Sequence, residues 1–171
     1  VSCFDVPHRL SSAITYELPL NPSSGFARAL VGGWQVNAIV TLQSGQPFTP
    51  FTSTLDPYRN EGFNRPDVIG NPNENVPPGL AFNPSAFRIP ALGTFGNAGR
   101  NIIRGDGFHS VDLSLFKNFA FTERWKLQFR AEAVNSFNHV NYQGPVVNLN
   151  SAAGAFVAAA PPRIIQFGLK L

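Results

Sequence analysis

Residues 125–133 read WKLQFRAEA, and this stretch decides the fold class. Apolar side chains occupy its odd positions, and polar or charged side chains occupy its even positions: Lys126, Gln128, Arg130 and Glu132. Strict alternation predicts a β-strand, because successive side chains of a strand point to opposite faces of the sheet. A soluble core would not accept this charged series, so we expect one face against an apolar medium and the other against water.

Four further windows alternate in the same way and predict four more strands: residues 10–18, 34–43, 110–115 and 165–171. At about 3.3 Å per residue, roughly ten residues tilted by ~45° cross on the order of 23 Å, close to the hydrocarbon thickness that a membrane β-barrel strand spans. We therefore predict an all-β chain, an antiparallel meander of about five strands that forms part of a transmembrane β-barrel.

The connections between these strands alternate in length. Residues 120–123 form a predicted tight turn and residues 19–33 a moderate link, which places both on one side of the membrane. Residues 44–109, which we interpret as a structureless connection, and residues 134–162 are long and belong to the other side. Short periplasmic turns and long extracellular loops are typical of outer-membrane barrels, whereas a compact soluble sandwich seldom carries such a long connection.

Composition excludes several other classes of protein. Only 13% of the residues are charged, and Gly and Pro number 15 each, which argues against coiled coils and helical bundles. No apolar run approaches ~18 residues, so no transmembrane helix is predicted. The net charge of +3 is scattered, so no nucleic-acid partner is expected, and the single cysteine excludes an internal disulfide framework or a Cys-based zinc site.

The polar face provides the candidate site. We expect side chains on two neighbouring strands to face a water-filled lumen: Asp112, Ser114, Lys126, Gln128, Arg130 and Glu132. Two interpretations stay open for this set, cross-strand charge pairing or contact with a substrate or plug. Aromatic residues at strand ends near the short turns predict an interfacial girdle: Tyr16, Trp34, Phe119, Phe121 and Trp125.

No catalytic or metal-binding constellation is predicted. His8, His109 and His139 stand far apart in the sequence, and none has a second ligand at helical spacing. The sequence contains no nucleophile elbow of the form G-x-S-x-G, and nothing suggests a pairing of Cys3 with a histidine. We therefore expect a non-enzymatic protein without a metal or cofactor.

A set of short stretches, spread from near the first residue to the last, is typical of one family. They are residues 4–10 (FDVPHRL), 16–19 (YELP), 32–35 (GGWQ), 44–48 (SGQPF), 96–101 (GNAGRN), 104–105 (RG), 112–118 (DLSLFKN), 129–132 (FRAE), 135–139 (NSFNH) and 162–171 (PRIIQFGLKL). In combination they resemble the C-terminal barrel of Oar-like TonB-dependent outer-membrane receptors.

This resemblance implies a barrel of about 22 strands with a plugged lumen. Residues 1–171 would then be the C-terminal portion of the barrel domain, a fragment that lacks the plug and the N-terminal strands. The implied location is the outer membrane of a Gram-negative-type bacterium. The implied partners are outer-membrane lipid, the missing strands and plug of the same protein, and the TonB complex through the absent region.

The leading hypothesis for function is therefore substrate uptake across the outer membrane, with this chain as a wall segment of the transporter. An alternative is a soluble or cell-surface β-sandwich that serves as a binding or adhesion module, with its apolar faces packed against each other. A barrel enzyme of the outer membrane is a weaker alternative, because no nucleophile constellation is present. The role of residues 44–109 and the identity of a substrate stay open.

Overall fold

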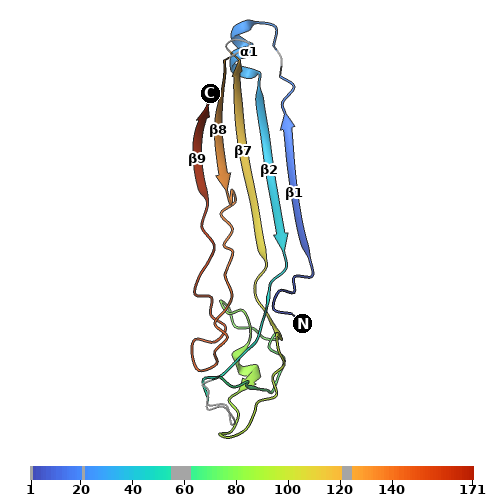
Figure 1. Ribbon diagram of the computed structural model, residues 1–171, viewed down its shortest axis with the longest axis vertical. Helices are drawn as coiled ribbons and strands as arrows, with labels where there is room; N and C mark the ends of the chain where they lie inside the picture. Colours follow the sequence, from blue (N-terminus) through green and yellow to red (C-terminus); the bar gives the residue numbers. More distant parts are fainter. Residues whose placement is uncertain (1, 21, 55–62, 121–124) are drawn as a thin grey trace. The chain divides into compact units, whose positions relative to one another are not determined.

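The computed structural model describes residues 2–20, 22–54, 63–120 and 125–171 (Figure 1). The chain divides into two compact units. The sheet unit comprises residues 9–42, 109–140 and 161–171, and the loop unit comprises residues 1–8, 43–108 and 141–160. Among the described residues, no helix has both the length and the apolar character needed to span a membrane.

The sheet unit contains a five-stranded sheet in the order β1-β2-β7-β8-β9. Its strands are β1 (Arg9–Glu17), β2 (Trp34–Gln43), β7 (Phe108–Ala120), β8 (Lys126–Val134) and β9 (Ile164–Lys170). Neighbouring strands run in opposite directions, so the sheet is an antiparallel meander (Figure 1). Each alternating window of the sequence falls on one of these strands, which confirms the predicted fold class. The described sheet is open, with β1 and β9 at its edges.

The strand register separates an apolar face from a polar face. Leu115 of β7 lies opposite Ala131 of β8, whereas the next pair along the strands joins Ser114 to Glu132 on the other face. Phe167 of β9 also lies opposite Ala131 and is 72% exposed. No second layer of described residues covers this side chain.

A short helix, α1 (Gly25–Val31), lies in the link between β1 and β2 and was not predicted. The Ser24 side chain caps it by accepting a hydrogen bond from the backbone N–H of Ala27 at 3.2 Å. The chain then turns into β2 at Gly33, which has φ +71°. A Cβ atom there would lie 2.6 Å from the carbonyl oxygen of Asn118, so only glycine fits this turn.

The loop unit corrects the expectation that residues 44–109 are structureless. Two small antiparallel sheets form within it, one from β3 (Pro47–Phe48) and β6 (Ile103–Arg104), the other from β4 (Asp67–Val68) and β5 (Phe87–Arg88). A 3-10 helix, η1 (Pro84–Ala86), precedes β5. A strand of two residues is too short to show an alternating pattern in the sequence, so these strands were not predicted.

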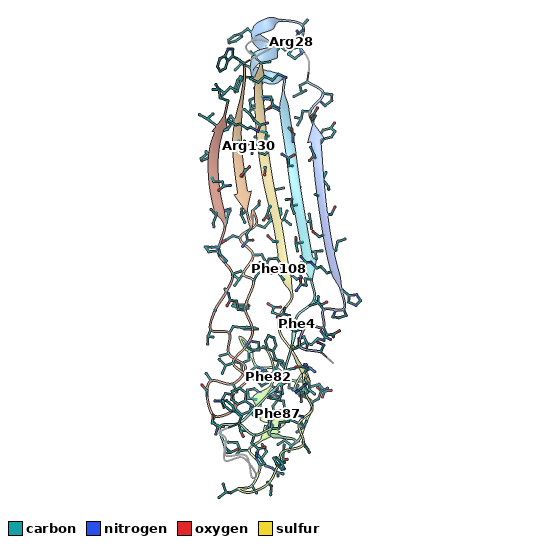
Figure 2. The ribbon with its side chains drawn as sticks, viewed as in Figure 1. Phe4, Arg28, Phe82, Phe87, Phe108 and Arg130 are labelled. Atoms are coloured by element: carbon teal, nitrogen blue, oxygen red, sulfur yellow. The ribbon has the colours of Figure 1, made fainter. Side chains whose placement is uncertain are left out.

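A buried cluster holds the loop unit together. Phe82, Ala86, Phe87 and Ile103 form its centre, and the rings of Phe82 and Phe87 meet edge to face with centroids 5.8 Å apart (Figure 2). The second long connection contributes to the same core through partly buried apolar residues: Val147, Leu149 and Ala153. Two connections that are distant in the sequence therefore form one folded unit. Of the predicted tight turn, Ala120 ends β7 and residues 121–123 lie outside the described residues.

Candidate functional site on the polar face of the sheet

The sheet gathers the predicted polar residues on one face. Ser114 of β7 lies opposite Glu132 of β8, and Asp112 precedes Ser114 by two positions on the same side of the strand. Lys126, Gln128 and Arg130 share the face of Glu132 by the same alternation. The six residues thus form one continuous patch over β7 and β8, and their role in contacting water, substrate or plug stays a prediction.

Arg130 is the centre of the contacts within this patch. Its Nε donates a hydrogen bond of 2.6 Å to the Oε1 atom of Gln128, and Gln128 in turn donates to Asn118 Oδ1 at 2.8 Å. The guanidinium carbon lies 4.8 Å from the centroid of the Phe116 ring on β7. Phe116 lies directly opposite Arg130 in the register, so the stacking follows from strand pairing (Figure 2 shows Arg130 on β8).

The two carboxylates of the patch accept hydrogen bonds, one from the backbone that follows β8 and the other from the edge strand β9. Asp112 accepts a hydrogen bond from the backbone N–H of Asn135 at 2.8 Å and another from Ser110 Oγ at 2.9 Å. Glu132 accepts one from the side chain of Gln166 on β9 at 2.5 Å. Cross-strand contact in this patch therefore consists of hydrogen bonds and cation–π stacking.

The cations of the same face have no carboxylate partner within the described part of the chain. Among the described residues, no ion pair involves Lys126, Arg130 or Lys170. Lys170 lies opposite Gln128 in the register, so it is next to the contacts that Arg130 makes. Among the described residues, the polar face at this end of β8 and β9 therefore carries an excess of positive charge, hereafter the cationic patch (Lys126, Arg130 and Lys170).

On the apolar face, a lysine that sequence reasoning missed lies beside two residues of the predicted aromatic girdle. Lys117 is only 2% exposed, and its ammonium lies 5.6 Å from the Trp34 ring centroid and 4.9 Å from that of Phe119. The ammonium also donates to the carbonyl oxygen of Gly32. In the sequence, Lys117 occupies a position that alternation assigns to the apolar face. A lysine at such a position is a signal that could have identified it, because lysine in a membrane strand usually keeps its charge at the interface.

The remaining girdle residues are distributed as follows. Tyr16, near the end of β1, is 58% exposed, and Trp125, just before β8, is 57% exposed. Both are at strand ends, as interfacial aromatic residues commonly are. Phe121 lies outside the described residues.

Two of the three histidines lie close together in the structure. His109 and His139, which are distant in the sequence, have ring centroids 5.2 Å apart, because the turn after β8 returns to the start of β7. The fold therefore brings together two histidines that their sequence positions alone would not pair. Within the part of the chain that the structure describes, no group of three or more His, Cys, Asp and Glu side chains could hold a metal ion.

A cavity of about 750 Å³ lies between α1 and the adjoining ends of β7 and β8. Helix α1 contributes Arg28 and Ala29, and the strands contribute Phe119 and Leu127 among others. Sequence reasoning missed this cavity because it depends on the unpredicted helix. Sequence reasoning also missed three contact residues on the polar face: Phe116, Asn118 and Gln166. Their partners are defined only by the strand register.

An open antiparallel sheet with one apolar face and one polar face is the arrangement expected of a membrane β-barrel wall. The sequence comparison agrees with this class. A family model described as "Outer membrane beta barrel domain" matches residues 1–166, nearly the whole chain. The chain belongs to this outer-membrane β-barrel family, and its location is the outer membrane of a Gram-negative bacterium. Searches of curated proteins and of solved structures found no match.

Proposed function

We propose that this chain is a wall segment of a TonB-dependent, receptor-like transporter that takes up substrates across the outer membrane and catalyses no reaction. The observation that carries the proposal is the cationic patch on the polar face. Its charges have no carboxylate partner in the described sheet, and a lumen occupied by a plug would supply one. The family resemblance of the sequence stretches supports the same assignment.

The open sheet supports the presence of further strands of the same protein. Unpaired backbone groups of β1 and β9 would each cost several kcal/mol in hydrocarbon, so additional strands must pair with both edges and close the barrel. A closed barrel of the size implied by the resemblance, about 22 strands, has a lumen wide enough to need a plug. The cationic patch would then contact acidic side chains of that plug.

The loop unit fits an external role in this proposal. The described part of this unit has its own buried core, which provides a packed scaffold for surface loops. Binding residues are commonly carried by loops on a rigid scaffold. We propose that this unit forms part of the external substrate entrance.

The test uses the complete barrel protein expressed in cells that lack other large pores. A variant with Lys126→Gln, Arg130→Gln and Lys170→Gln should hold its plug less firmly. We expect such cells to become several-fold more sensitive to a glycopeptide antibiotic that is too large for general porins. Arg100→Gln is the matched control, because Arg100 is an exposed cation of the loop unit.

Two outcomes would contradict the proposal. Equal and high antibiotic sensitivity in the native protein and all variants would indicate an open, porin-like pore. Equal and low sensitivity would indicate that the cationic patch does not retain a plug. Binding of the periplasmic domain of TonB to the complete protein, measured by calorimetry, tests energy coupling separately.

A further inference from the structure

Helix α1 is attached to the lipid-facing side of the sheet. The indole N–H of Trp34 donates to the carbonyl oxygen of Leu30 at 3.0 Å, and the ammonium of Lys117 donates to the carbonyl oxygen of Gly32. Trp34 and Lys117 are both on the apolar face, where Lys117 lies opposite Phe129. The C-terminal carbonyl groups of α1, which have no partner inside the helix, are thus held by side chains of the surface that faces lipid.

The helix itself presents apolar side chains that no described residue covers. Phe26 is 79% exposed and Leu30 is 55% exposed. They are four residues apart, so they lie next to each other on one side of the helix. Val31, at the end of the helix, adds a further exposed apolar side chain. A folded protein rarely leaves such a set against water without a partner.

We propose that α1 is an interfacial helix that inserts Phe26 and Leu30 into the phospholipid leaflet next to the short turns of the barrel. Its apolar side would lie at the boundary between acyl chains and headgroups, at the level of the aromatic girdle. Trp34 and Lys117 have the side-chain chemistry that anchors membrane proteins at this depth. The helix extends the lipid contact of the barrel wall beyond the ends of its strands.

The size and charge of the exposed surface favour lipid over a protein partner. A stable protein interface buries about 800 Å² on each side, whereas one phenylalanine provides on the order of 200 Å² and a seven-residue helix is only about 10 Å long. The helix carries Arg28 and no acidic residue. Arg28 is exposed, and the negatively charged phosphates of lipid headgroups attract such a cation.

The test places spin labels on the complete barrel protein in vesicles of phosphatidylethanolamine and phosphatidylglycerol. In a Cys3→Ser background, single cysteines replace Phe26, Leu30, Leu169 or Asn73. Leu169, on the apolar face of β9, serves as the lipid reference, and Asn73, an exposed residue of the loop unit, serves as the water reference. The collision rates of each label with oxygen and with a water-soluble nickel chelate are measured.

We expect labels at 26 and 30 to collide with oxygen at least three-fold more often, relative to the nickel chelate, than the label at 73. Their calculated depth should lie between those of positions 73 and 169. Nickel accessibility equal to that at position 73 would place α1 in water and overturn the proposal. Low accessibility to both reagents would show that protein covers the helix, with the same consequence.

Folding of each variant is checked by its heat-dependent mobility on a gel, and the two helix positions give independent readings if one variant does not fold. A second measurement replaces Phe26 with tryptophan, uses brominated lipid as the quencher and subtracts the quenching of the parent protein, which contains Trp34 and Trp125. Quenching at least half as strong as that of a tryptophan placed at 169 is expected, and an unquenched residue would overturn the proposal. The result depends on the outer-membrane location alone, so it can fail while the transport proposal stands.

Discussion

The guanidinium of Arg130 lies over the ring of Phe116 on the neighbouring strand, with its carbon 4.8 Å from the ring centroid. The pair is on the polar face of the sheet, where a phenylalanine interrupts the series of polar residues in β7. The stacking gives the Phe116 ring a favourable cation–π partner on this polar face. It also orients Arg130 so that its Nε donates a hydrogen bond to Gln128. The contact therefore fixes the position of one of the three cations of the patch.

A double-mutant cycle should measure this stacking. Phe116→Leu and Arg130→Met each remove the contact, and we expect a coupling free energy of about 0.5–1 kcal/mol between them, the range found for partly exposed cation–π pairs. The free energy of unfolding is measured by urea titration of the complete barrel protein in lipid vesicles. A coupling indistinguishable from zero would show that the two side chains do not interact in the membrane.

Substitution of Gly45 should unfold the loop unit locally. A Cβ atom at this position would lie 1.9 Å from the backbone oxygen of Gly105, so Gly45→Ala forces the two segments apart. We expect faster hydrogen exchange throughout the loop unit and unchanged exchange in β8. Gly25→Ala is the matched control, because nothing lies within 4 Å of its Cβ and alanine favours the helix by about 1 kcal/mol.

Truncation of Phe82 should destabilise the loop unit more than any surface change. Phe82 is 0% exposed at the centre of the buried cluster, and Phe→Ala in a core costs about 3–5 kcal/mol. Limited proteolysis should then cut the loop unit while the strands stay protected by lipid. Phe63→Ala, at an exposed position, should leave the digestion pattern of the native protein unchanged.

Replacement of Lys117 should release α1 from the sheet. Lys117→Met keeps the length of the side chain but removes the ammonium that binds Gly32 and lies over the ring of Trp34. Because the freed carbonyl loses a charged donor, we expect α1 to open about ten-fold more often, or roughly 1.4 kcal/mol, as measured by hydrogen exchange of residues 25–31. Lys170→Met, on the polar face, is the control and should not change that exchange.

The sequence alone determined the class of fold and the two faces of the sheet. Alternation between apolar and polar residues is a local property, and it is readable because each strand of a membrane barrel faces lipid on one side and water on the other. The strands containing Trp34 and Lys126 were therefore predicted within a residue or two of their ends. The same alternation placed Arg130 and Glu132 on one face.

Tertiary structure decided the features that depend on contacts between distant segments. The core around Phe82, the approach of His109 to His139 and the contact of Lys117 with α1 each join residues far apart in the chain, and no local pattern records such pairs. Hydrogen-bond partners on the polar face likewise followed only from the register between β7, β8 and β9. The physical reason is that local alternation defines which way a side chain points, whereas packing of the whole chain defines what it meets there.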